Sequence, residues 1–139
     1  MIKLYSEKIL ALATEIPHTT SLSSPDVSIT KRSPVCGSSI TVELIVRNGK
    51  IIEFSQNVRA CALGQAAATI VGNVVLGLKR NELLIAHDQL MNMLTKNGSP
   101  PDKPFEDLEV LLPAKDYKNR HASIMLSLEA ILAGLDSVG

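Results

Sequence analysis

The sequence predicts a single α+β domain over residues 1–139, with a small three-stranded antiparallel sheet and helices packed mainly on one face. Two observations carry this prediction. Apolar and polar residues alternate over residues 39–47, apolar markers recur over 50–59, and Asn48-Gly49 between them predicts a hairpin turn because both residues accept positive φ. Helical patterns lie before and after this hairpin, which is an element order typical of an α+β fold.

The first 33 residues predict a helix followed by an extended segment. Apolar residues share one helical face over residues 5–16, with Ser6 as the N-cap and Pro17 as the residue that ends the helix. Residues 18–33 are rich in Ser and Thr, and we expect them to form an extended loop with a short edge strand.

Four helices are expected after the hairpin. Dense alanine over residues 60–78 favours a helix that packs closely on the sheet. A second helix is expected over residues 81–96, capped by Asn81 and terminated by Asn97-Gly98. A short helix over residues 105–112 should end at Pro113, and the last helix should run over residues 119–135.

The composition argues against several classes of partner. The chain carries 14 basic and 14 acidic residues, so its zero net charge implies no general attraction to nucleic acid or to an anionic membrane. Aromatic residues make up only 3%, which leaves few stacking platforms for bases. No uninterrupted apolar run reaches the roughly 18 residues of a membrane span, and the charged N-terminal helix is not a signal peptide. We therefore expect a cytoplasmic protein.

Cys36, Cys61 and His121 are the candidate ligands because each lies at a junction between expected elements. Cys36 lies in a turn before the first hairpin strand, Cys61 lies where the second strand passes into the alanine-rich helix, and His121 opens the last helix. Unpaired N–H groups at a helix start favour the thiolate form of a cysteine. Two thiolates and an imidazole suit zinc or iron–sulfur chemistry. On spacing alone, two buried cysteines and a surface histidine stay an open alternative.

Several motifs occur in an order that resembles the NifU/IscU family of iron–sulfur cluster assembly scaffolds. They are Tyr5-Ser6-Glu7-Lys8, Val35-Cys36-Gly37, Asn48-Gly49, Cys61 before an Ala-rich helix, and His121-Ala122-Ser123. The resemblance spans nearly the whole chain. It implies a compact α+β fold that holds iron or a transient [2Fe–2S] cluster, with zinc as a second ion for the same site. Cys36, Cys61 and His121 match the family's first cysteine, second cysteine and histidine.

Two positions depart from the family pattern. Ser38 stands where the family usually has an aspartate, and Ala122 is matched to the third cysteine. The resemblance then implies that sulfur delivery would use Cys36 or Cys61. Loss of the aspartate implies a longer-lived cluster.

The function expected from this resemblance is that of a scaffold or carrier, and not of an enzyme. The implied partners are a cysteine desulfurase, apo iron–sulfur proteins and an Hsp70-type chaperone, the last through Leu112-Pro113-Ala114-Lys115. A cluster that bridges a homodimer would compensate for the small ligand set. Two alternatives stay open: a metal-free docking module and a zinc-dependent sulfur acceptor. The sequence contains no Ser-His-Asp set, phosphate loop or paired-carboxylate motif of a hydrolase or kinase.

Overall fold

The computed structural model describes residues 4–34 and 37–138, and it contains one α+β arrangement. The elements in chain order are α1 (Glu7–Ala13), β1 (Val27–Arg32), β2 (Ser39–Arg47), β3 (Lys50–Arg59), α2 (Ala62–Val74), α3 (Arg80–Thr95), the 3-10 helices η1 (Glu106–Asp116) and η2 (Lys118–Arg120), and α4 (His121–Val138). The α+β class predicted from the sequence is confirmed.

The described residues form one three-stranded antiparallel sheet in the order β1-β2-β3. The bounds of β2 and β3 agree with the prediction, and Asn48 and Gly49 both have positive φ in the turn between them. β1 lies within the predicted loop as its edge strand. Alternation along β2 places Ile40, Val42 and Leu44 in the core, while the other face of the sheet carries polar side chains.

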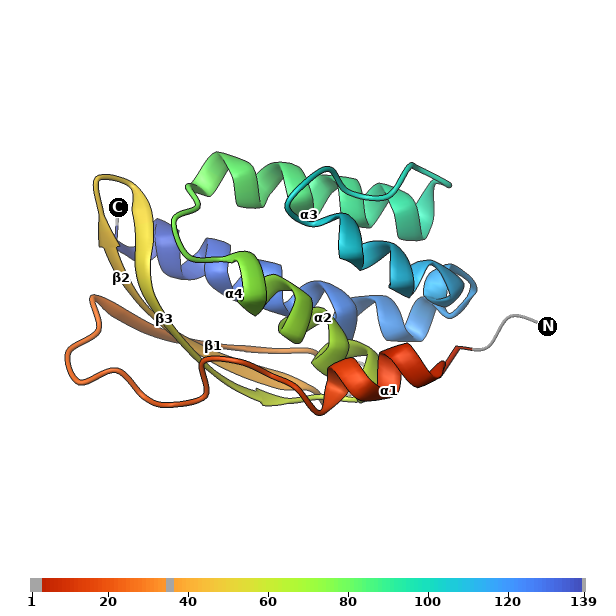
Figure 1. The fold of residues 1–139 in the computed structure, drawn as a ribbon, viewed down its shortest axis with the longest axis horizontal. Coiled ribbons are helices and arrows are strands. Elements are labelled where there is room, and N and C mark those ends of the chain that lie inside the picture. Colours follow the sequence, from red (N-terminus) through yellow and green to blue (C-terminus); the bar gives the residue numbers. More distant parts are fainter. Residues whose placement is uncertain (1–3, 35–36, 139) are drawn as a thin grey trace.

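The helices cover one face of the sheet in two layers (Figure 1). α4 contacts β1 and β2, and α2 contacts β3 and α4, so these two helices form the layer next to the sheet. α3 contacts α4 and η1 on the far side from the strands, while α1 packs on α2. This arrangement brings the first turn of α4 and the first turn of α2 to the same region of the molecule.

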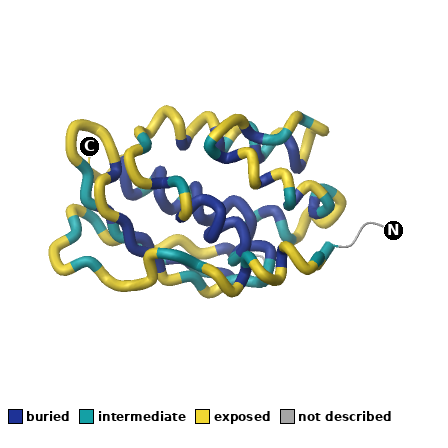
Figure 2. Tube along the Cα trace, viewed as in Figure 1, coloured by how far each residue is buried: buried dark blue, intermediate teal, exposed yellow. Residues whose placement is uncertain are grey.

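α4 is the central helix of the core (Figure 2). Together with η2 it forms a helical segment, Lys118–Val138, that is long and apolar enough by length and composition to cross a membrane, with a mean hydropathy of 1.3. However, 67% of its most apolar 18-residue window is buried inside the protein. The sheet, α2 and α3 surround this helix, and this burial explains why it needs an apolar sequence.

The predicted bounds of three helices are corrected by the structure. α1 is shorter than predicted because it ends at Ala13, although Ser6 is its N-cap and accepts a hydrogen bond from the Ile9 amide at 3.2 Å. α2 begins after Cys61 and ends at Val74, four residues before the predicted end. α3 begins one residue early, with Lys79 rather than Asn81 at the N-cap, because the Glu82 carboxylate accepts from the Lys79 amide at 3.1 Å.

The segment before α4 also differs from the prediction. Residues 106–116 form a 3-10 helix that continues through Pro113, where the sequence predicted the end of a short helix. The last helix begins at His121 rather than at residue 119, because η2 fills the preceding turn. The predicted end of α3 is confirmed, since Asn97 has a φ of 55° and the Gly98 amide donates to the Asn92 carbonyl at 2.9 Å.

Candidate functional site

The candidate site lies where the ends of three elements meet at one end of the sheet. Ser39 at the start of β2 pairs with Arg59 at the end of β3, so the residues just outside both strands are neighbours. Ser38 precedes β2, and Cys61 follows β3 and caps α2. The first turn of α4 completes the group, because the Ser123 hydroxyl reaches both Ser38 and Cys61.

Cys61 is a free, half-buried thiol at the N-cap position of α2. Its backbone is extended, with φ of −67° and ψ of 169°, and its side chain makes no capping hydrogen bond. The Cys61 carbonyl nevertheless accepts the Gln65 amide at 2.9 Å, which fixes the residue to the first turn of the helix. The thiol is therefore held in place by the backbone while its sulfur stays available for other contacts.

Ser123 is the α4 residue that the structure brings to Cys61, and sequence reasoning missed it. Its Oγ lies 3.5 Å from the Cys61 Sγ and 3.1 Å from the Ser38 Oγ. The resemblance matches Ala122 to the family's third cysteine, but the side chain that faces the thiol is that of the next residue, Ser123. Ser123 is almost fully buried. One sequence feature could have indicated Ser123: its spacing from Ser127 places two serines on one face of an apolar helix.

Gly64 makes the close approach of Ser123 possible. A Cβ at residue 64 would overlap with the Ser123 Oγ, and it would also lie 2.9 Å from the Ala60 Cβ and 3.1 Å from the Ser123 carbonyl. A methyl group in this place would therefore collide with the Ser123 hydroxyl and make a tight contact with the backbone of the opposite helix. The glycine in the first turn of α2 is a condition for the contact between Ser123 and Cys61.

His121 joins the end of η1 to the start of α4. Its Nε2 donates to the Ala114 carbonyl at 2.9 Å, so the buried ring ties η1 to the start of α4. The ring also lines a cavity of about 480 Å³ with Leu94, Thr95, Asn97, Lys115, Asp116 and Lys118. Side chains two residues apart on a helix point about 200° away from each other. His121 and Ser123 therefore leave α4 on nearly opposite sides, and it is Ser123 that faces Cys61.

Cys36 lies outside the described residues. On either side of it, the Ser33 amide donates to the Ser38 carbonyl at 2.8 Å and the Gly37 amide donates to the Ser33 carbonyl at 3.0 Å. Gly37 has a φ of 72°, a left-handed backbone conformation that glycine adopts without steric cost. Within residues 4–34 and 37–138, no group of three His, Cys, Asp or Glu side chains is placed to hold a metal ion.

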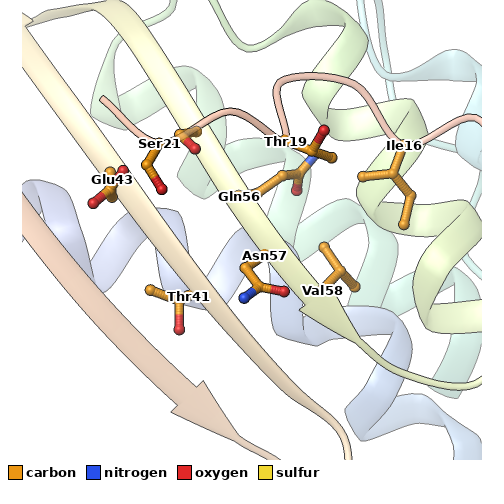
Figure 3. A pocket seen from close by; sticks show the side chains of 9 residues that line it. Ile16, Thr19, Ser21, Thr41, Glu43, Gln56, Asn57 and Val58 are labelled. Atoms are coloured by element: carbon orange, nitrogen blue, oxygen red, sulfur yellow. The ribbon is translucent and has the colours of Figure 1, made fainter. Parts of the chain in front are cut away.

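A second cavity lies apart from this cluster, between the segment after α1 and the strands (Figure 3). It has a volume of about 290 Å³ and is lined by Ile16, Thr19, Ser21, Thr41, Glu43, Ser55, Gln56, Asn57 and Val58. The Gln56 Nε2 donates to the Pro17 carbonyl at 3.1 Å, and the Glu43 carboxylate accepts the Leu22 amide at 2.9 Å. These bonds fasten the segment to the sheet, and the cavity shares no lining residue with the cluster around Cys61.

Structural comparison finds solved proteins with a similar fold. The N-terminal part of a nitrogen-fixing NifU-like protein from Brucella abortus matches with a TM-score of 0.94 and 36% sequence identity, covering 97% of this chain and 94% of that one. A protein described as an iron–sulfur cluster assembly scaffold for the SUF system, from Fervidobacterium islandicum AW-1, matches with a TM-score of 0.84 and 18% identity, covering 95% and 96%. A hypothetical protein matches with a TM-score of 0.84 and 19% identity, covering 96% and 97%.

The sequence searches add no further relative, since no protein-family model and no curated protein sequence matches the chain. The two matches below 25% identity establish the fold alone. The Brucella protein is more than 30% identical over nearly the whole of both chains, and its N-terminal NifU-like character agrees with the order of motifs in the sequence. The chain therefore belongs to the NifU/IscU type, the family of NifU N-terminal domains.

Proposed function

We propose that this protein is an iron–sulfur cluster assembly scaffold or carrier, which binds iron or a [2Fe–2S] cluster and passes it to apo-proteins. One observation carries the proposal. A half-buried free thiol, Cys61, lies where the ends of β2, β3 and α4 meet, in a chain that belongs to the NifU/IscU family. The description of the Fervidobacterium protein as a scaffold supports the same assignment.

The proposed ligands are Cys36, Cys61 and His121. A cysteine thiolate is the usual ligand of an iron–sulfur cluster, and imidazole can replace it on one iron. For His121 the hydrogen bond to Ala114 sets the tautomer: a carbonyl can only accept, so Nε2 carries the proton and Nδ1 keeps the lone pair that could bind a metal. Since Ser123 rather than His121 faces Cys61, we expect the two cysteines to contribute more to binding than the histidine.

The charges around this end of the sheet support an anionic cargo. Arg32 and Arg59 both pair with Ser39 across the sheet, so two exposed arginines flank the strand that follows Ser38. Lys118 and Arg120 directly precede α4. Thiolates and sulfide are negative, and a set of cations nearby lowers the free energy of holding them together.

The partners we propose follow from this role. A cysteine desulfurase would supply sulfur, and apo iron–sulfur proteins in the cytoplasm would receive the cluster. An Hsp70-type chaperone is proposed for the segment from Leu112 to Lys115, where Leu112 is 36% exposed. A second copy of the chain could supply the missing ligands, because three protein ligands leave one position of a tetrahedral site open.

Anaerobic reconstitution tests the proposal. The purified protein is incubated with ferrous iron and sulfide, and the visible spectrum, iron and acid-labile sulfide are measured after desalting. We expect a bound cluster in wild type and its loss in Cys36→Ala and in Cys61→Ala, with a smaller loss in His121→Ala. His87→Ala is the matched control for the histidine, because His87 contacts Asp88 and Glu129 away from the proposed ligands.

Two outcomes would replace this proposal with its alternatives. Absence of bound metal in wild type, together with no effect of either cysteine variant, would leave a metal-free docking module. Zinc retained by wild type without a cluster, with persulfide on Cys36 or Cys61 after exposure to a desulfurase, would indicate a zinc-dependent sulfur acceptor.

A further inference from the structure

We infer that Ser123 is a positioning residue that donates a hydrogen bond to the Cys61 sulfur when this sulfur holds its cargo, with Ser38 as the donor behind it. The inference rests on the proposed function, because it concerns the sulfur of a proposed ligand. Two distances support it: the Ser123 Oγ lies 3.5 Å from the Cys61 Sγ and 3.1 Å from the Ser38 Oγ.

The direction of these hydrogen bonds follows from the number of protons. In the free protein either Cys61 or Ser123 can be the donor, because a thiol and a hydroxyl each carry one proton. A sulfur that ligates iron has lost its proton, so it can only accept. Ser123 must then donate to Cys61, and its remaining contact with Ser38 must be one in which it accepts. Binding of the cargo therefore converts an undirected pair into a chain from Ser38 through Ser123 to Cys61.

The burial of Ser123 makes this contact more effective than one at the surface. Ser123 is 1% exposed and Ser38 is 3% exposed, so water does not compete freely for either hydroxyl. A hydroxyl at this position cannot ligate iron as a thiolate does and cannot carry a persulfide, so α4 contributes a donor rather than a third sulfur. The helix thereby stabilises negative charge on the Cys61 sulfur without adding to it.

The expected consequence is a change in the reduction potential of the cargo. Hydrogen bonds to cluster sulfurs stabilise the reduced form, which is the more negative one, and they raise the potential. Removal of the Ser123 hydroxyl should therefore make the potential more negative. The bond also restrains the Cys61 side chain, so the cluster should be released faster once the hydroxyl is gone.

Ser127 provides the matched control variant. It lies one helical turn after Ser123 on the same face of α4, it is also buried, and among the described residues its Oγ has no hydrogen-bond partner. The Ser127→Ala substitution thus removes the same atom from the same helix without removing a hydrogen bond.

The experiment is a redox titration of the reconstituted cluster in wild type, Ser123→Ala and Ser127→Ala. We expect a more negative midpoint potential for Ser123→Ala only, and a faster loss of its visible spectrum in the presence of an iron chelator. Equal potentials in all three proteins, or an equal shift in both variants, would overturn the inference while leaving the scaffold function intact. A wild-type protein that assembles no cluster would instead contradict the proposed function itself.

A second variant tests the same geometry without the cluster. In Ser123→Cys a second thiol takes the place of the hydroxyl next to Cys61. With cobalt(II) as the probe, this variant should show a stronger thiolate-to-metal charge-transfer band than wild type. Ser127→Cys should not show this increase, and a band of equal strength in both variants would contradict the placement of residue 123 at the site.

Discussion

At the scale of single residues, the site depends on which side chains are small. Ser123 enters the space beside Cys61 because Gly64 has no Cβ. Gly134 in α4 has a different neighbour. A Cβ there would come within 2.9 Å of a methyl carbon of Leu44, which is the flexible end of a side chain. Substitution of the two glycines by alanine therefore distinguishes a collision with a tightly held neighbour from a contact that a flexible side chain can relieve.

Gly64→Ala should destabilise the protein and disturb the site. Overpacking costs typically about 1–3 kcal/mol, and the better helix propensity of alanine offsets about 1 kcal/mol of this. Urea denaturation should give a lower midpoint for Gly64→Ala and a smaller change for Gly134→Ala. Cobalt binding should weaken only in Gly64→Ala. Equal stability of wild type and Gly64→Ala would mean that α2 and α4 are less close than the structure indicates.

At the scale of elements, the Asp26 carboxylate fastens the end of the loop before β1 to β2. The Asp26 Oδ2 accepts from the Val46 amide at 2.7 Å and from the Arg47 Nη1 at 2.8 Å. The hydrogen bond from the Val46 backbone is the largest cause that lowers the pKa of Asp26 below its ordinary value; partial burial opposes this change, and Arg47 reinforces it. The bonds lie next to the irregular pairing between Ile45 and Val46, where β2 needs a partner outside the sheet.

The Asp26 contacts predict a stability difference that depends on pH. Because the folded-state pKa is lowered, the carboxylate stabilises the fold above its unfolded-state pKa of about 4, and this contribution is lost as the pH falls towards the folded-state value. The urea midpoints of wild type and Asp26→Asn should therefore differ by a constant amount between about pH 5 and about pH 7. The two midpoints should converge as the pH falls below about 4. A difference that stays constant down to about pH 2.5 would contradict the role assigned to this carboxylate.

At the scale of the whole molecule, α4 joins the sheet to the outer helix layer. It contacts β1, β2, α2 and α3, and it carries the largest share of the buried residues of any helix in the described chain. Two polar contacts join α3 to α4. The Arg80 Nε lies 2.7 Å from the Asp136 Oδ1, and the His87 Nε2 lies 3.3 Å from the Glu129 Oε2. An exposed ion pair such as Arg80–Asp136 adds little stability, so the apolar interior must supply most of it.

Leu128→Ala tests this distribution of stability. Leu128 is fully buried in α4, and truncation of such a leucine costs about 2–5 kcal/mol because it leaves a cavity. Val138→Ala, on the same helix but 38% exposed, should change the free energy of unfolding by less than about 0.5 kcal/mol. Both are measured by urea denaturation, and similar effects of the two substitutions would show that α4 is not the central core helix.

The sequence by itself determined the features that depend on local interactions. The bounds of β2 and β3, the turn at Asn48 and Gly49, the cap at Ser6 and the end of α3 at Asn97 were all predicted from neighbouring residues. Boundaries that depend on packing were less well predicted. Pro113 continues a 3-10 helix instead of ending one, and α2 begins after Cys61 rather than before it.

Only the tertiary structure decided which α4 residue faces Cys61. The order of motifs predicts that Cys61 and the segment 121–123 belong to one site. However, His121, Ala122 and Ser123 point in directions that differ by about 100° from one residue to the next. Which of the three faces Cys61 depends on how α4 is rotated against α2. This rotation depends in turn on Gly64, which lies 59 positions before Ser123 in the sequence. No pattern within a single helix encodes this rotation, because it is set by the packing of residues that meet only in the folded protein.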